Sequence, residues 1–396
     1  MSIPAKGALD GLRVLDLTRL LPGAFCTQLL ADMGAEVIKI EEPGRGDYNR
    51  EFVPINVKES GSFLLLNRNK KSVTLNLKSD EGKALFLKLV AGADIVVEGF
   101  RPGVMDRLNL GYDRLAAENP GLIYCAISGF GQTGPYRLMP GHDLNYLSLA
   151  GGARLFAGRD GRPIVPGLSI ADVGGGSQMA ATGILAAVIA RGRDGAGQFI
   201  DISMTDGAFS WLAYHGADWL FAGDNPRGGQ RPFIGSAPCY NIYECADGGF
   251  VALGIIEAHF WERFCTAVGM EDLIADQWPD DDAAEVQFNR LNALFLTKPR
   301  DVWVAELEPA DIPFSAVYDV GEAFDDPQLK ARDMMLSVDH PVEGTIPQLG
   351  FPIKLSGTPC AITAPPPTLG QHNAELLGDL GLDDADIARL AETNVI

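Results

Sequence analysis

The sequence is poor in histidine and has no paired cysteines. It contains five histidines among 396 residues, and its six cysteines stand far apart, with no Cys-x-x-Cys pair and no Cys/His cluster at zinc spacing. The opening residues show no signal-peptide pattern, and unpaired cysteines are typical of reducing compartments. We therefore predict a cytoplasmic protein without a metal centre.

The chain also lacks a basic excess and a long apolar run. Its 32 Lys and Arg against 52 Asp and Glu give a net charge of −20, which argues against binding to nucleic acid or to anionic membranes. The longest apolar run, 179–190, is about half of the roughly 20 residues that a membrane-spanning helix needs. We expect a buried helix there, and neither a nucleic-acid partner nor a membrane partner.

The chain is long enough for two domains, and its first part alternates between strand and helix patterns. A single core stops growing near roughly 250 to 300 residues. The expected strands cover 13–17, 36–40, 72–77, 94–100, 121–128 and 197–203, with helices at about 22–33 and 81–93. This alternation predicts an α/β fold, with a Rossmann-like doubly wound parallel sheet in the large domain.

The pattern changes after residue 205. A Gly/Arg/Pro-rich stretch near 222–238 marks a boundary, and two strands around an Asp-Gly-Gly turn follow it. We expect a large α/β domain in 1–205, a linker helix and loop in 206–232, a small α+β domain in 233–325, and a C-terminal segment, 326–396, that returns to the large domain.

The stretch "GFGQTGP" contains the G-x-G-x-x-G spacing of dinucleotide-binding loops, directly after an expected strand. Pro135 and Tyr136 follow where the phosphate-binding helix should begin, and no acidic residue stands about 20 positions further on. We therefore interpret Gly129, Gly131 and Gly134 as turn residues that bring backbone close to a ligand.

Two helix starts offer acid and base candidates. His142 and Asp143 open "HDLNYLSLAGG", where a lone histidine is more often structural but has the one side chain that titrates near neutral pH. Asp172 precedes three glycines and a long helix. A role as the N-cap of that helix explains this aspartate as well as a role in acid–base chemistry does. The three glycines exceed what a cap requires and suit a wall along which a substrate passes close to the main chain.

A third acid and two basic stretches complete the candidates. Glu257 ends an expected strand and begins a helix in the small domain, where a first-turn Glu is also a common structural residue. The basic stretches are natural seats for phosphates in an acidic chain, although such runs are more often a solvated face. They contain Arg68, Lys70, Lys71 and Lys78, and Arg101 and Arg107.

Seven ordered motifs together resemble the class III CoA-transferase (CaiB/BaiF) family, most closely its α-methylacyl-CoA racemase branch. They are "GLRVLDLTRLLPGAFCTQLLADMGAEVIKIEEPGRGD", "NRNKKSVTLNLKSDEG", "EGFRPGVMDRLNLGY", "GFGQTGP", "GHDLNYLSLAGG", "ADVGGG" and "YECADGGFVALG". The resemblance runs from about residue 10 to beyond 330.

The resemblance implies an acyl-CoA thioester as substrate, with coenzyme A as part of it and no separate cofactor. It implies an interlocked homodimer with the active site between subunits, and a CoA-binding role for the large domain. In the racemase branch the two bases fall on His142 and Asp172, and Glu257 supports the histidine across the interface. The substrate-binding and CoA-binding residues implied are Arg19, Arg68, Lys71, Arg101, Gly141, Asp143, Tyr146, Gly174, Gly175 and Tyr240.

This assignment favours a racemase that moves the proton α to a thioester through an enolate, with one base on each face. One position departs from the branch: Leu168 stands where racemases place an asparagine that holds the aspartate. A CoA-transferase, in which Asp172 forms an anhydride and then a CoA thioester, needs no histidine at position 142 and stays an alternative. A non-catalytic acyl-CoA-binding protein is the third hypothesis.

Overall fold

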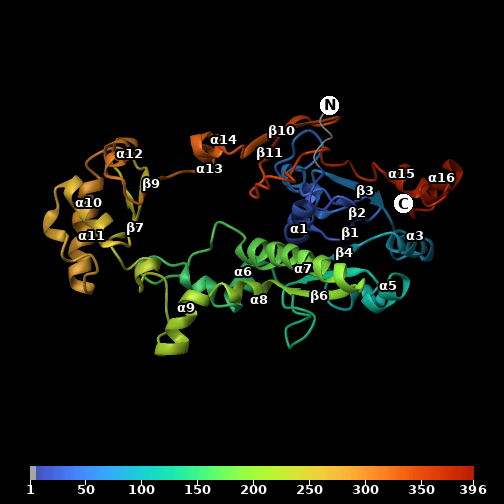
Figure 1. The fold of residues 1–396 in the computed structure, drawn as a ribbon, viewed down its shortest axis with the longest axis horizontal. Helices are drawn as coiled ribbons and strands as arrows, with labels where there is room; N and C mark the ends of the chain where they lie inside the picture. The colour runs from blue at the N-terminus through green and yellow to red at the C-terminus, as the bar shows by residue number, and fades with distance from the viewer. Residues whose placement is uncertain (1–5) are drawn as a thin grey trace. The chain divides into compact units, whose positions relative to one another are not determined.

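The computed structural model describes residues 6–396, and the first of its two compact units contains a six-stranded parallel sheet (Figure 1). The strands are β1 (Arg13–Asp16), β2 (Glu36–Glu41), β3 (Lys70–Thr74), β4 (Ile95–Glu98), β5 (Ile123–Ser128) and β6 (Gln198–Ser203). Their order is β3-β2-β1-β4-β5-β6, and every neighbouring pair is parallel. This is the doubly wound order of mononucleotide-binding folds, so the predicted fold class is confirmed for the large domain.

Helices cover both faces of this sheet, and the residues of its central strands are buried on both sides. One face packs against α3 (Asp80–Ala91), α4 (Val104–Arg107) and α5 (Tyr112–Glu118) through a core that includes Leu15, Ile38, Phe86 and Tyr124. The other face packs against α1 (Leu20–Asp32) and α7 (Met179–Asp194). Two short helices, α2 (Gly61–Leu66) and α6 (Asp143–Leu149), lie in the loops that connect strands.

The C-terminal segment returns to this sheet. Helices α15 (Asn373–Gly378) and α16 (Asp384–Glu392) bring Leu376, Leu377 and Leu390 into the core beside β3 and α3 (Figure 1). Arg389 forms an ion pair with Glu81 at 2.6 Å. The antiparallel hairpin of β10 (Met335–His340) and β11 (Gly344–Leu349) was not expected from the sequence.

The apolar helix after Asp172 is longer than the sequence indicated. A π-helical segment, Ile170–Gln178, runs directly into α7, and the combined helix of 25 residues is long and apolar enough to cross a membrane by those criteria alone. Of its most apolar window, 44% is buried, and it packs on β5 and β6. Core helices of soluble proteins pass the same test, so this length alone indicates no membrane association.

A second compact unit consists of residues 151–167 and 212–330. Its antiparallel sheet contains β7 (Tyr240–Glu244), β8 (Phe250–Gly254) and β9 (Phe314–Val317), and the expected strands around the Asp-Gly-Gly turn are β7 and β8. Helices α10 (Ala258–Val268), α11 (Asp281–Phe295) and α12 (Arg300–Leu307) pack on it around Trp261, Phe264 and Phe295. Two further short helices, α13 (Val320–Asp325) and α14 (Pro327–Ala331), follow.

The structure divides the chain differently from the sequence analysis at two places. Residues 151–167, placed in the large domain, fold with the second unit, because the Gly228 N–H bonds the Arg154 carbonyl at 3.1 Å and Arg159 stacks over Phe288. The expected linker 206–232 is split. Its first residues complete α8 (Met204–Ser210) in the first unit, and residues 212–232 belong to the second.

Candidate functional site

The strand order reverses between β1 and β4, and the carboxyl ends of these two strands define the ligand crevice of a doubly wound sheet. Arg19 follows β1 and Arg101 follows β4, so these two expected CoA-binding arginines lie in the loops at this switch point. The guanidinium of Arg19 lies 5.5 Å from the ring of Phe100, which precedes Arg101. The fold therefore places these two arginines, 82 positions apart in the sequence, directly after neighbouring strands of the sheet.

Arg19 is held between aromatic rings. Its Nη1 donates to the Tyr48 hydroxyl at 2.6 Å, and its guanidinium centre lies 4.8 Å from the Tyr48 ring. Glu42 Oε2 forms an ion pair with Arg19 Nη2 at 3.6 Å, which is longer than a hydrogen bond. This arginine is half-buried, and the hydrogen bond to Tyr48 orients its guanidinium.

Arg101 is exposed and lines a cavity of about 260 Å³ on the α4/α5 side of the sheet. Glu98, at the end of β4, lines the same cavity and accepts a hydrogen bond from the Phe100 N–H at 2.6 Å. Burial, together with the charge of Asp106, raises the pKa of Glu98 to about 8, against the hydrogen bond from Phe100. The sequence analysis did not identify Glu98 as a candidate. The pattern that could have identified it is an acidic residue at the end of an otherwise apolar strand.

Asp172 is the third residue of the π-helical segment that follows Ser169. Its backbone N–H donates to Asp143 Oδ1 at 2.9 Å, so Asp143 satisfies one of the free N–H groups at this helix start. Burial raises the pKa of Asp172 to about 7, and the neighbouring charge of Asp143 adds to the effect. π-Helical turns are rare in proteins as a whole but frequent at functional sites, because they orient side chains in directions that an α-helix would not.

The three glycines after Asp172 serve packing, which corrects the expectation of a glycine wall along the substrate. A Cβ on Gly174 would lie 2.2 Å from the Trp211 ring, and one on Gly175 would lie 2.6 Å from the Met204 carbonyl oxygen. All three are buried against α8 and α1. The helix also begins at Ile170, before the glycines, so their N–H groups are not the free ones at its start.

His142 is the N-cap residue of α6 and its backbone N–H donates to Asn145 Oδ1 at 3.1 Å. The side chain of His142 is exposed and makes no cap hydrogen bond. Tyr146, one turn further on, is buried and donates its hydroxyl hydrogen bond to the Gly141 carbonyl. Burial and the charge of Asp172 raise the pKa of Tyr146 to about 12, against the opposing charge of Arg101.

Helix α6 and the π-helical segment pack on each other, so His142, Asp143, Tyr146 and Asp172 gather in one region of the first unit. The glycine loop before them forms turns, with φ of 78° at Gly131 and 82° at Gly134, and no helix starts until Asp143. A phosphate-binding helix therefore does not follow the G-x-G-x-x-G spacing, as the sequence analysis expected.

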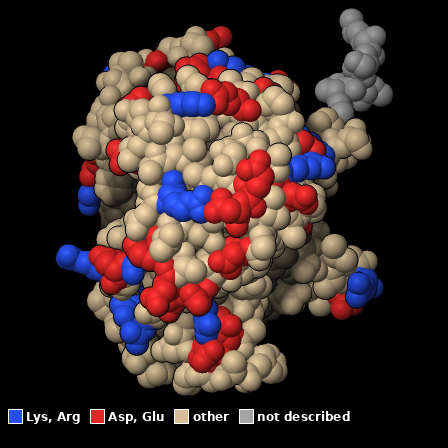
Figure 2. Space-filling model, turned by 90° about the vertical axis from the view of Figure 1, so that its left-hand side faces the viewer, with Lys and Arg blue, Asp and Glu red and all other residues tan. Residues whose placement is uncertain are grey.

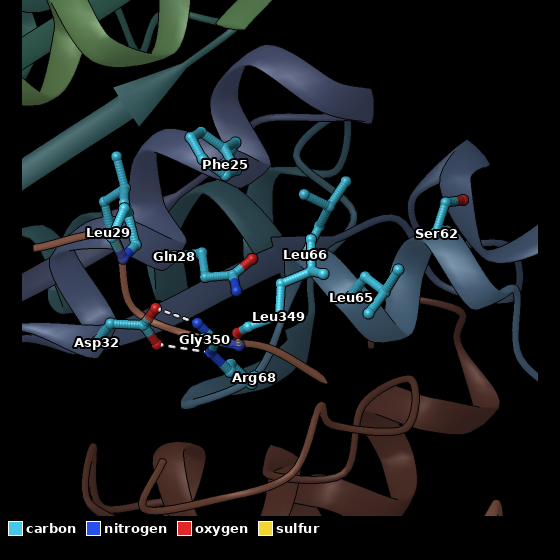
Figure 3. Close-up of a pocket in the computed structure, with 11 residues that line it drawn as sticks. Phe25, Gln28, Leu29, Asp32, Ser62, Leu65, Leu66, Arg68, Leu349 and Gly350 are labelled. Atoms are coloured by element: carbon cyan, nitrogen blue, oxygen red, sulfur yellow. Dashed lines mark hydrogen bonds and ion pairs between the residues drawn. The ribbon is translucent and has the colours of Figure 1, made fainter. Parts of the chain in front are cut away.

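Arg68 and Lys71 lie elsewhere and are already paired, so the structure does not bring them to the crevice. Arg68 is 2% exposed and binds Asp32 through two hydrogen bonds of 2.9 and 2.7 Å. Figure 3 shows this pair beside Gln28 in a cavity of about 240 Å³ with largely apolar walls. Lys71 bonds Glu36 at 2.8 Å and Glu375 at 2.6 Å.

Tyr240 and Glu257 belong to the second unit. Glu257 follows β8, caps α10 with its backbone carbonyl and keeps an exposed side chain, so the expected strand-to-helix position is confirmed. Tyr240 begins β7 and packs edge-on against Phe233. Both side chains are at least partly accessible.

The charges of the described residues form no large basic surface on the face drawn in Figure 2, where acidic and basic side chains alternate. Within residues 6–396 no group of three or more His, Cys, Asp or Glu side chains is placed to hold a metal ion. An anionic ligand therefore depends on local cations such as Arg19 and Arg101.

Comparison with known proteins gives consistent matches over nearly the whole chain. The chain is 37% identical to an acyl-CoA transferase of Fusarium pseudograminearum, over 99% of this chain and 89% of that protein. It is 33% identical to the human α-methylacyl-CoA racemase, over 98% of this chain and 97% of the racemase. A crystal structure of a CaiB/BaiF family protein from Brucella suis superposes with a TM-score of 0.83 at 33% identity, covering 95% of this chain and 100% of that one. The family model of CoA-transferase family III matches residues 9–373, and the chain belongs to this family.

Proposed function

We propose that the protein is a racemase of 2-methylacyl-CoA or of similar α-substituted acyl-CoA thioesters. The observation that carries the proposal is the raised pKa of Asp172, about 7, next to the helix that His142 begins. A group that must remove a proton in one direction and return it in the other works best when its pKa lies near the operating pH. A nucleophile, in contrast, acts only in its ionised form.

In the proposed mechanism His142 and Asp172 face opposite sides of the α-carbon. One of them removes the proton as a base while the other, in its acid form, delivers a proton to the opposite face. The enolate oxygen formed between these steps requires hydrogen-bond donors. The candidate donors are the backbone N–H groups in the first turn of the helix that begins at Ile170. The N–H of Asp172 is not one of them, because it already donates to Asp143.

The anionic part of the thioester is assigned to the crevice between β1 and β4, where Arg19 and Arg101 supply positive charge. Coenzyme A enters as part of the substrate, and the mechanism uses no metal and no further cofactor. We keep the cytoplasm as the proposed location.

We further propose that two chains interlock as a homodimer, with Glu257 and Tyr240 of one chain completing the site of the other. Support comes from large apolar side chains that the single chain leaves exposed and that a partner chain would bury. They include Leu138, Met139, Leu144, Leu149, Leu168, Phe209, Trp211, Trp219, Leu220 and Phe221.

CoA transfer between carboxylic acids, with Asp172 as nucleophile, is the second candidate. It is favoured by the position of Leu168, where the racemase branch has an asparagine and where this side chain is 78% exposed. The Fusarium relative also bears a transferase name. In this reaction the raised pKa of Asp172 would reduce the ionised fraction at neutral pH.

Incubation of the enzyme with one enantiomer of 2-methylacyl-CoA in deuterated water, without an acceptor acid, separates the two reactions. The racemase proposal expects deuterium at the α-carbon and loss of chirality. A result in which nothing happens until a free carboxylic acid is added would establish transfer instead. His142→Ala is the matched variant, because only the racemase reaction needs this imidazole.

A further inference from the structure

One buried aspartate touches both sides of the loop that presents Arg19. Asp47 follows β2 and is 1% exposed, and its Oδ1 accepts hydrogen bonds from the backbone N–H of Leu20 at 3.1 Å and of Asn49 at 3.0 Å. The second bond caps the short 3₁₀ helix η1 (Tyr48–Glu51), which begins with the tyrosine that Arg19 contacts. A single carboxylate thus fixes the backbone after Arg19 and the ring beside its guanidinium.

A buried lysine holds the other side of the same loop. Lys39, in β2, is fully buried; its Nζ lies 2.8 Å from Asp47 Oδ2 and donates to the Thr18 carbonyl at 2.8 Å. Burial lowers the pKa of Lys39, but the charges of Asp47 and Asp16 outweigh it and raise the pKa, so the ammonium stays charged. The peptide units before and after Arg19 are therefore both tied to one buried ion pair.

The loop needs this support because its backbone is strained. Leu20 has a φ of 63°. Residues other than glycine adopt this left-handed backbone conformation only when their surroundings enforce it. The N–H of Leu20 is the one that Asp47 holds. The turn aims the Arg19 side chain at Tyr48 and Phe100, at the mouth of the crevice.

We propose that Asp47, acting with Lys39, is a positioning residue that fixes Arg19 in the orientation in which it binds the phosphates of the acyl-CoA substrate. The inference rests on the proposed function in one respect, the assignment of the anionic part of the substrate to Arg19. A side chain that is already oriented loses less conformational entropy when it binds, so the affinity of the site depends on the loop behind it.

A double-mutant cycle measures this coupling, with coenzyme A as the probe and its dissociation constant read by titration calorimetry. Arg19→Gln should weaken binding roughly tenfold, the size of one charge-assisted hydrogen bond. Asp47→Asn keeps the size of the side chain and one oxygen, and should weaken binding about threefold to tenfold. The double variant should bind no more weakly than Arg19→Gln alone, since the second change has no oriented arginine left to disturb.

Three further measurements keep the outcomes apart. Pantetheine, which carries no phosphate, should bind all variants alike. Tyr48→Phe removes only the hydroxyl that Arg19 contacts and leaves the buried pair intact, so it tests the orientation if Asp47→Asn folds poorly. Glu343→Gln is the matched control, because Glu343 is another buried carboxylate that holds loop N–H groups, those of residues 57–59, without touching Arg19.

Two results would overturn the inference and leave the proposed function intact. One is that the losses of affinity in the double-mutant cycle are additive. The other is that Asp47→Asn and Tyr48→Phe both keep full affinity although Arg19→Gln weakens binding. Unchanged affinity in Arg19→Gln would instead overturn the assignment of the phosphates to this crevice, and the inference with it.

Discussion

Two carboxylates in the first unit, the buried Asp16 and the partly buried Asp172, have opposite electrostatic surroundings. Asp16 lies among Lys39 and Lys70, in a buried charge network that these three residues form with Asp47. Burial by itself raises the pKa of Asp16, but the two lysine charges outweigh it and lower the pKa to about 2. Asp172 has the charge of Asp143 nearby, and burial raises its pKa to about 7. Burial alone therefore does not decide whether a carboxylate is ionised, since nearby lysine charges reverse its effect at Asp16 and none do so at Asp172.

The difference separates a structural role from a chemical one. A permanently charged, fully paired carboxylate stabilises the loop after β1 and has no reason to exchange protons near neutral pH. A carboxyl group that is half-protonated near pH 7 suits proton transfer, at the cost of stability in its ionised form. The four predictions that follow test this contrast, from the largest expected effect to the smallest.

Asp172→Asn should remove the acid–base group while preserving its shape and its helix. We expect exchange of the α-proton with deuterated water to fall by about 10²–10⁴-fold, the usual contribution of a positioned general acid or base. The free energy of unfolding at pH 7 should stay the same or rise, because the amide mimics the neutral acid. Exchange at the wild-type rate would remove Asp172 from the mechanism.

Asp16→Asn should have the opposite pattern, with a large loss of stability. It leaves Lys70 without its carboxylate partner in the buried charge network, and breaking a buried ion pair costs roughly 3–5 kcal/mol. Urea denaturation measures this loss. At low temperature, where the variant stays folded, the rate per folded molecule should change far less than in Asp172→Asn; an equal loss of rate would contradict the contrast drawn here.

Asp143→Asn should shift the pH profile of the reaction. The amide keeps an oxygen for the Asp172 N–H but removes the neighbouring negative charge, so the pKa of Asp172 falls while burial still holds it above its usual value. We expect the limb of the kcat/KM profile that reports this group to move to lower pH by about half a unit to one unit. An unshifted limb would mean that it reports another residue.

The two carboxylates should also give the stability curve opposite slopes. Asp16 has a folded-state pKa below its unfolded value of 3.8, so the stability that it contributes is complete above that value and is lost as the pH falls towards 2. Asp172 has a folded-state pKa above its unfolded value, so stability decreases as the pH rises from 3.8 to about 7. Asn variants at each position should flatten the corresponding part of the curve, measured by urea denaturation at a series of pH values.

Much of the first unit could be predicted because its information is local. Alternation of apolar strands with amphipathic helices placed all six strands to within a few residues, and the helix-start pattern at His142 located α6. The hairpin β10–β11 was missed because its strands, such as "GTIPQL", have neither regular alternation nor a short turn signal. Residues 151–167 were assigned to the wrong unit, since nothing in their sequence shows that Arg154 bonds Gly228.

The candidate site, like the fold, could be predicted from the sequence only in part. Helix starts identified His142, Asp143 and Asp172, a basic stretch identified Arg101, and the family resemblance implied Arg19. The fold places these residues after β1 and β4 or beside the π-helical segment. Composition also singled out Arg68 and Lys71, but charge in the sequence does not show which cations already have partners. Asp32, Glu36 and Glu375 neutralise them.

The sequence by itself determined the order of strands and helices and the family, because both depend on patterns that read along the chain. Only the tertiary structure decided what each polar group does. It placed Lys39 and Lys70 beside Asp16, set Asp143 against Asp172, and filled the space at the three glycines with Trp211 and α8. The reason is physical: a pKa, an ion pair or a close packing contact depends on distances between residues far apart in the chain, and those distances exist only after folding.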